Sequence, residues 1–118
     1  MRFGPYPGRV VSVHDGDTIR VEVDLGFGVW QRGLSARLYG INAPELSTPE
    51  GKLAREYLKT LVAPGDPVTV WSFGWDKYGG RFDAEIAREN GDVVNHLMIE
   101  AGHAKVMTYK AEDPAGSA

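Results

Sequence analysis

The chain has 118 residues, of which 42% are apolar and 25% charged, and this composition is typical of one globular domain with one core. The absence of cysteine excludes disulfides and thiolate zinc sites, and no apolar run reaches the roughly 18 residues of a membrane-spanning helix. The net charge of −3 argues against a broad basic surface for nucleic acid, so any phosphate would be bound by a few arginines or through a metal ion.

Residues 1–8 are rich in proline and glycine, and they predict an irregular lead-in. The same stretch has no apolar segment like that of a signal peptide, so we expect a cytoplasmic protein by default. At the other end, residues 110–118 are mostly small or charged and predict a disordered tail. A single domain is therefore expected over residues 9–109.

The segment Val10–Val23 carries the strongest pattern, because apolar and polar residues alternate on both sides of His14–Thr18 as they do in half-buried strands. The central Asp-Gly pair is typical of a turn, so this segment either turns the chain or bends one strand. A ligand site is the other interpretation. On extended backbone Asp15 and Asp17 point to the same side, and two such carboxylates usually need a cation or a shifted pKa. Gly16 between them would let a ligand or another backbone come close.

The next elements follow from turn residues and from hydrophobic period. Gly26–Gly28 predicts a hairpin turn, and Gly33 interrupts the strand that follows it. A helix begins after residue 46, where Ser47 with Glu50 fits a capping box while Pro49 fits Thr48 as the cap, and the sequence leaves both open. A second helix is expected with Asp92 as its cap, followed by a short strand over His103–Tyr109.

These elements predict a mainly β fold with helices, in the α+β class. We expect an OB-fold-like, five-stranded antiparallel barrel with two covering helices. The expected strands are Val10–Val13, Ile19–Val23, Leu34–Ile41, Val68–Phe73 and Arg81–Arg88, and the expected helices are Pro49–Val62 and Asp92–Ala101.

Polar residues gather at the breaks between these strands, where functional residues are common. Each of them alone has an ordinary explanation as a solvated strand residue, a turn former, a partner of the helix dipole or part of a hairpin loop. Together they form a chemical set: carboxylates for a hard cation such as Ca²⁺, a glutamate to activate water, and two arginines to clamp a phosphate. This set predicts metal-assisted hydrolysis of a phosphodiester. Its members are Asp15, Asp17, Arg37, Asn42, Glu45, Lys77, Tyr78 and Arg81.

Four segments resemble the signature blocks of the staphylococcal-nuclease-like (thermonuclease) family, in that family's order and over about residues 9–109. They read V-H-D-G-D-T-I-R-V, A-R-L-Y-G-I-N-A-P-E, D-K-Y-G-G-R-F and V-V-N-H-L-M-I-E-A-G-H-A-K-V. The resemblance implies an OB-fold barrel and Ca²⁺-dependent cleavage of DNA and RNA with little sequence specificity. We expect a monomer that acts on nucleic acid and not at a membrane.

The resemblance also implies the residues of a metal site. Asp17 corresponds to the metal-binding carboxylate, Asp15 to its outer-shell companion, and Ala43 to the residue whose backbone carbonyl binds the metal. Asn42 departs from the family, which usually has a second metal-binding aspartate there. An asparagine keeps one carbonyl oxygen but loses a charge, so the site is expected to bind Ca²⁺ less tightly.

The catalytic residues implied by the resemblance are Arg37 and Arg81, which hold the phosphate, and Glu45, which acts on the attacking water. Arg81 comes one place later than the family's second arginine because Gly80 intervenes. We interpret Gly80 as a loop insertion, since counting back from Ala84 restores the register. The implied substrate-binding residues are Lys77, Tyr78 and Tyr109.

Two alternatives remain open from sequence. The chain could be a non-catalytic OB-type nucleic-acid-binding or interaction module with an eroded metal site, although retention of Asp17, Arg37, Glu45 and Arg81 favours the nuclease. It could also be a protein-interaction domain that uses exposed tryptophans, which an apolar patch around them would support. These tryptophans are Trp30, Trp71 and Trp75.

Overall fold

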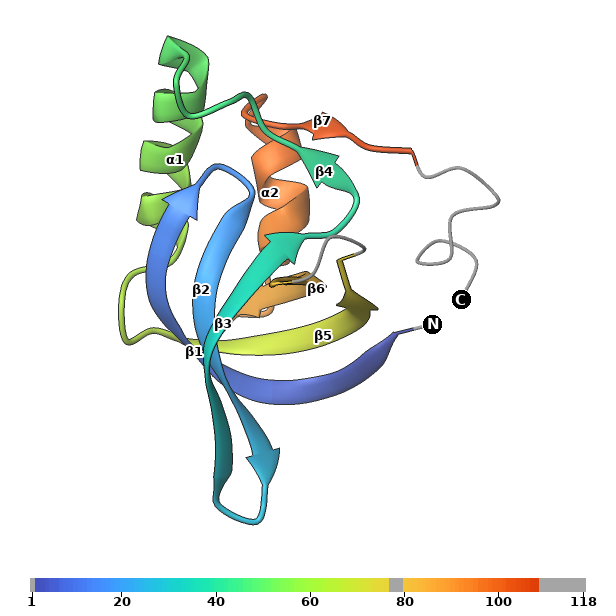
Figure 1. The fold of residues 1–118 in the computed structure, drawn as a ribbon. Helices are drawn as coiled ribbons and strands as arrows, with labels where there is room; N and C mark the ends of the chain where they lie inside the picture. Colours follow the sequence, from blue (N-terminus) through green and yellow to red (C-terminus); the bar gives the residue numbers. More distant parts are fainter. Residues whose placement is uncertain (1, 77–79, 109–118) are drawn as a thin grey trace.

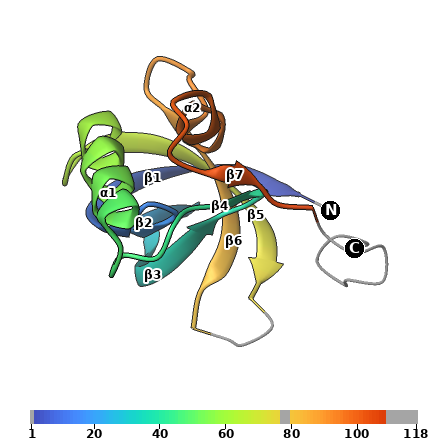
Figure 2. The ribbon, with the colours of Figure 1, turned by 90° about the horizontal axis from the view of Figure 1, so that it is seen from above.

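The computed structural model describes residues 2–76 and 80–108, and within them five strands close into a barrel with two helices at one end (Figures 1 and 2). The neighbours around the barrel are β1–β2–β3–β6–β5. Their bounds are β1 Phe3–Asp15, β2 Thr18–Gly26, β3 Val29–Leu38, β5 Pro67–Trp75 and β6 Phe82–Arg88. The helices are α1 Pro49–Leu61 and α2 Val94–Glu100, and a small ribbon pairs β4 Ile41–Asn42 with β7 Lys105–Val106. The expected α+β barrel with two helices is confirmed.

The seam between β3 and β6 is parallel, with Ala36 opposite Phe82 and Arg37 opposite Asp83. The other pairings of the barrel are antiparallel. The expectation of a wholly antiparallel barrel is therefore wrong at this seam. The reason is geometric: strand direction cannot alternate all the way round a closed ring with an odd number of strands, so one pair must run in parallel.

The N-terminal segment is also more regular than expected, because β1 begins at Phe3 and pairs with β5 as well as β2. The expected irregular lead-in over residues 1–8 is therefore wrong from residue 3 onward. One of the glycines in this segment, Gly8, is required for space. A Cβ there would lie 3.0 Å from the Glu22 carbonyl oxygen and 3.0 Å from the Val70 side chain. Glycine lets β1 pass closely between its two neighbours. The expected tail at 110–118 lies outside the described residues.

Local hydrogen bonds settle the helix caps. Thr48 is the cap of α1, since its Oγ1 accepts a hydrogen bond from the Gly51 N–H at 3.0 Å and Pro49 follows it. The expected Asp92 cap of α2 is wrong. The cap position is Val93, without a side-chain bond, because the Asp92 carboxylate accepts a hydrogen bond from Asn90 in the turn after β6.

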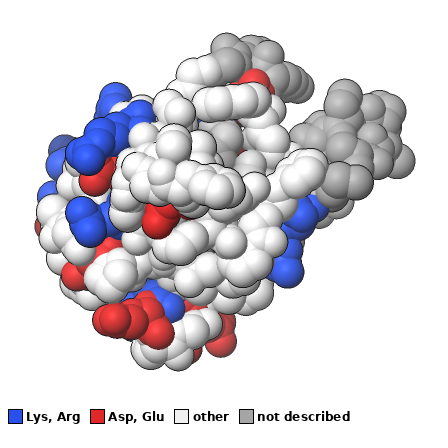
Figure 3. Space-filling view, turned by 90° about the horizontal axis from the view of Figure 1, so that it is seen from below, with Lys and Arg blue, Asp and Glu red and all other residues white. Residues whose placement is uncertain are grey.

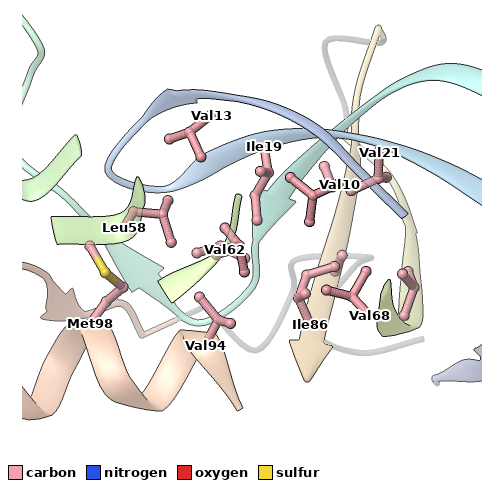
Figure 4. Packing of buried hydrophobic residues seen from close by; sticks show 14 of the residues in the cluster. Val10, Val13, Ile19, Val21, Leu58, Val62, Val68, Ile86, Val94 and Met98 are labelled. Carbon is pink, nitrogen blue, oxygen red and sulfur yellow. The ribbon is translucent and has the colours of Figure 1, made fainter. Parts of the chain in front are cut away.

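The core fills the barrel and continues under both helices (Figure 4). Inward residues of the strands, such as Ile19 and Ile86, meet Leu58 of α1 and Met98 of α2, all of them fully buried. The helices therefore cover one end of the barrel, while the β2–β3 hairpin extends from the other (Figure 1). No helix in the described part of the chain is long and apolar enough to span a membrane.

Candidate active site

The Asp-Gly-Asp segment forms the tight turn between β1 and β2, at the end of the barrel that carries the helices. The Asp17 N–H donates to Asp15 Oδ1 at 3.1 Å, which fixes the turn. Gly16 is needed for space, because a Cβ there would lie 2.8 Å from the Cβ atoms of both Ala43 and Ala54. The close approach foreseen at this glycine is therefore made by α1 and by the segment after β4.

Asp17 is the buried carboxylate of this turn, with 8% of the residue exposed. Its Oδ2 accepts a hydrogen bond from the Ala43 N–H at 3.0 Å, and its Oδ1 accepts one from the Thr18 hydroxyl at 3.2 Å. Burial raises the pKa of Asp17 and neighbouring Asp15 adds to the rise, while the Ala43 N–H and the Arg37 charge oppose it. The negative charge of Asp17 is thus only partly compensated by the protein.

Arg37 lies beside Asp17 near the end of β3, with 11% of its side chain exposed. Its Nη2 is 3.8 Å from Asp17 Oδ2 and donates to Asn42 Oδ1 at 3.3 Å. The same nitrogen is 3.7 Å from Met107 Sδ. The structure therefore brings together three residues that the sequence analysis singled out, and they come from the β1–β2 turn, β3 and β4.

Arg81 lies on the other side of the parallel seam, immediately before β6. Asp83, two residues after Arg81, lies opposite Arg37 in the β3–β6 pairing. Residues two apart in extended chain share a face, and the intervening Phe82 points into the core, so both arginines belong to the outer face of this seam. Arg81 Nε donates to Asp76 Oδ2 at 3.1 Å, and 39% of its side chain is exposed.

Glu45 is exposed, and its backbone is held tightly by the start of α1. Its carbonyl oxygen accepts hydrogen bonds from the Thr48 N–H at 2.9 Å and from the Thr48 hydroxyl at 2.6 Å. A Cβ on Gly51 would overlap this carbonyl, so the close packing depends on that glycine. Within the described residues, the Glu45 carboxylate makes no ion pair, which leaves it open to solvent.

Two further predicted residues, Asp15 and Ala43, support the cluster through single hydrogen bonds. Asp15 supports the turn through its Oδ1, and Ala43 directs its N–H toward Asp17. The predicted role of the Ala43 carbonyl stays a prediction. Lys77, Tyr78 and Tyr109 lie outside the described residues.

The donor set of this cluster fits a hard divalent cation in type. The Asp17 and Asn42 side chains offer oxygen atoms, the predicted Ala43 ligand is also an oxygen, and Asp17 carries a partly uncompensated charge. The negative charge available to a metal ion at this site is low, because the described residues contain no group of three or more Asp, Glu, His or Cys side chains that could hold a metal. The residues therefore fit Ca²⁺ as a weak site and do not fit a transition metal that prefers nitrogen or sulfur.

Sequence reasoning missed Asn95, which is 3% exposed in α2. Its Oδ1 accepts a hydrogen bond from the Ile86 N–H at 3.1 Å, and its Nδ2 donates to the carbonyls of Tyr39 at 2.9 Å and Ala84 at 3.0 Å. Asn95 thus ties α2 to β6 and to the turn that connects Arg37 with Asn42. The available signal was a polar residue next to Val94, at a position of α2 where the helical period puts core residues.

Comparison with known proteins adds three findings. A family model described as Staphylococcal nuclease homologue matches residues 35–117. The chain is 39% identical over 107 residues to a protein of Escherichia coli O157:H7 named "Uncharacterized endonuclease", covering 91% of this chain and 65% of that protein. It is 35% identical over 114 residues to endonuclease YhcR of Bacillus subtilis strain 168, covering 86% of this chain and 9% of that protein. The chain thus spans just under two thirds of the Escherichia coli protein and a small part of YhcR.

Proposed function

The chain belongs to the staphylococcal nuclease homologue family, as its four sequence blocks predicted, and from this premise we propose that it is a Ca²⁺-dependent endonuclease. Its substrates are DNA and RNA, cut with little sequence preference, and it acts as a monomer. The observation that carries the proposal is a cluster at one end of the barrel. There Arg37 Nη2 lies 3.3 Å from Asn42 Oδ1 and 3.8 Å from Asp17 Oδ2.

The arginines bind the scissile phosphate in this proposal. Arg37 is held by Asn42 and Asp17, so its planar fork is oriented before substrate arrives. Arg81 approaches from the other side of the seam and is oriented by Asp76. Two arginines on one face stabilise the negative charge that grows on the phosphoryl oxygens as water attacks.

Glu45 acts on the water. Its carboxylate is exposed, and its backbone is fixed by Thr48, so it accepts the proton as the water oxygen bonds to phosphorus and the phosphorus–oxygen bond to the leaving group breaks. Asp17, Asn42 and the Ala43 carbonyl would hold Ca²⁺, with Asp15 supporting them from outside. A bound Ca²⁺ would supply positive charge beside the reacting phosphate.

The test is digestion of plasmid and single-stranded DNA with Ca²⁺, Mg²⁺, Mn²⁺ or chelator, using the wild type and a matched pair of arginine variants. Arg37→Lys keeps the charge and loses the fork, so activity should fall about 100-fold or more. Arg32→Lys is the control, because Arg32 lies on the same strand, is exposed and pairs with Glu22 at 2.9 Å. Equal activity of the two variants, or wild-type cleavage in chelator, would contradict the proposal.

The second candidate is a nucleic-acid-binding module without catalysis. The observation in its favour is that residue 42 is an asparagine. Arg37 therefore contacts a neutral amide at this position, and the carboxylate beside it comes from Asp17. The same assay separates the two functions, because a binding module retards DNA in a gel but cuts it in none of the metal conditions. The acidic chain would bind such DNA weakly without a metal.

A further inference from the structure

The end of the barrel opposite the helices is open and hollow. A pocket of about 390 Å³ lies there, lined by Phe3, Tyr6, Trp75 and Phe82 together with aliphatic residues of β2 and β3. No charged side chain lines it among the described residues. Figure 3 views the molecule from this side and shows mostly uncharged atoms, with acidic groups near the centre and at the lower edge and lysines and arginines mainly toward the left and right edges. We call the pocket and its rim the barrel-mouth surface.

The barrel-mouth surface exposes large apolar side chains. Trp75 is 65% exposed, Phe3 is 52% exposed and Leu25 is 49% exposed. The Trp75 ring meets Phe82 edge to face, with centroids 6.3 Å apart and planes at 78°, so its orientation is fixed while most of its surface faces solvent. By contrast, Trp71 and Trp30 are partly covered, with the guanidinium groups of Arg2 and Arg9 over their rings. A clustered apolar surface of this kind usually marks a binding site.

This surface is continuous with the phosphate-binding side of the seam. Trp75 directly precedes Asp76, which holds the Arg81 side chain at 3.1 Å and donates its N–H to the Arg81 carbonyl at 2.8 Å. Phe82 directly follows Arg81. The Trp75–Phe82 pair therefore lies one strand residue, about 3.3 Å of chain, from the arginine. The Arg81 and Phe82 side chains leave the strand on opposite faces, so the base that reaches Trp75 belongs to a neighbour of the nucleotide whose phosphate contacts Arg81, with the strand passing over the rim of the barrel.

We propose that the barrel-mouth surface binds an unpaired nucleobase of the substrate strand, stacked on Trp75. The proposal rests on the proposed function, because it extends the nucleic-acid site beyond the scissile phosphate. A base is flat, aromatic and uncharged, which matches an uncharged hollow with one exposed indole. Stacking on an aromatic ring tolerates any base, so the surface adds affinity without sequence preference. A base paired in a duplex cannot reach it, so the surface favours single strands.

The experiment measures binding and cleavage of a fluorescein-labelled oligothymidylate and of an oligomer of the same length whose residues are abasic. Trp75→Ala should raise the Kd and KM for oligothymidylate about tenfold, equivalent to about 1.4 kcal/mol. Trp75→Phe should recover most of this affinity, whereas Trp75→Leu keeps an apolar side chain and should not. The abasic oligomer should bind wild type and Trp75→Ala with the same Kd. Trp71→Ala is the matched control, because its ring lies under Arg2 outside the pocket.

The outcomes separate this proposal from the proposed function. If the wild type cuts oligothymidylate and Trp75→Ala has the wild-type KM, the base site is refuted while the nuclease stands. An equal loss of affinity for the abasic oligomer would also refute it, because the effect would then not depend on bases. Sedimentation that shows a dimer dissociated by Trp75→Ala would assign the surface to a second copy of the chain instead. If the wild type cuts neither oligomer in any metal, the proposed function itself fails.

Discussion

Replacing Asn95 with alanine removes three hydrogen bonds from the centre of the fold. The Ile86 N–H loses its acceptor in a buried place, which costs about 2–3 kcal/mol. The Tyr39 and Ala84 carbonyls each lose one donor, at about 0.5–1 kcal/mol each, and Ala84 keeps the Tyr39 N–H as a partner. We expect Asn95→Ala to lower the free energy of unfolding by about 3–5 kcal/mol, a large part of the stability of a domain of this size.

Urea denaturation of the metal-free protein measures this loss, with His96→Ala as the control. His96 is the exposed neighbour on the same helix, so its replacement should change stability by less than about 0.5 kcal/mol. Asn95→Asp gives a second arm, because a carboxylate cannot donate to two carbonyls. Its pKa would be raised in the folded state, so its stability should be best at low pH and fall as the pH rises through the carboxylate range. A loss below about 1.5 kcal/mol for Asn95→Ala would refute the reasoning.

Three further predictions concern the candidate site. Arg81→Lys keeps the charge but loses the fork, so kcat/KM should fall by an amount equivalent to about 2–4 kcal/mol without a change in thermal stability; wild-type turnover would mean that the Gly80 insertion takes Arg81 out of the site. Asn42→Asp adds a charged oxygen, so calorimetric titration should show Ca²⁺ binding about tenfold tighter, or about 1.4 kcal/mol; no binding by either protein at millimolar Ca²⁺ would favour the binding module. Asp17→Asn should abolish activity yet raise the Tm of the metal-free protein at neutral pH, because the raised pKa of Asp17 makes its charged form unfavourable in the fold. This gain should disappear at pH values below the ordinary carboxylate pKa, where Asp17 is protonated in both states, and an equal gain at all pH values would contradict the cause.

Much of the fold was predictable because the hydrophobic period is a local property of the chain. Alternation around Val10 and Ile19, and the polar turn between them, predicted a strand pair whose connection proved to be a tight turn. The direction of the β3–β6 seam was not predictable from either strand alone, because it follows from closing a ring of five. Gly8 and the prolines near it suggested irregular chain, whereas the glycine serves the close crossing of strands.

The site was predictable only in part for the same reason. The types of residue were visible in sequence, and the resemblance indicated which of them belong together. Their contacts depend on tertiary structure. Arg37 lies next to Asp17 because β2 pairs with β3, and it lies next to Asn42 because the chain turns at Tyr39, whose carbonyl is bound by Asn95. Asn95 itself has no local signal beyond a polar side chain in an apolar stretch. The Asp76 partner of Arg81 likewise depends on how the β5–β6 connection folds back.

The parallel seam has a consequence for when the protein can act during its own synthesis. Its two strands are separated in the chain by α1 and β5, so β3 waits for most of the domain to leave the ribosome before β6 can join it. Arg37 belongs to the first strand of the seam, and Arg81 directly precedes the second. A nascent chain that ends before β6 therefore carries one of the two arginines of the proposed phosphate clamp. In the proposed function, the pair of arginines is therefore completed only after β6 has joined β3.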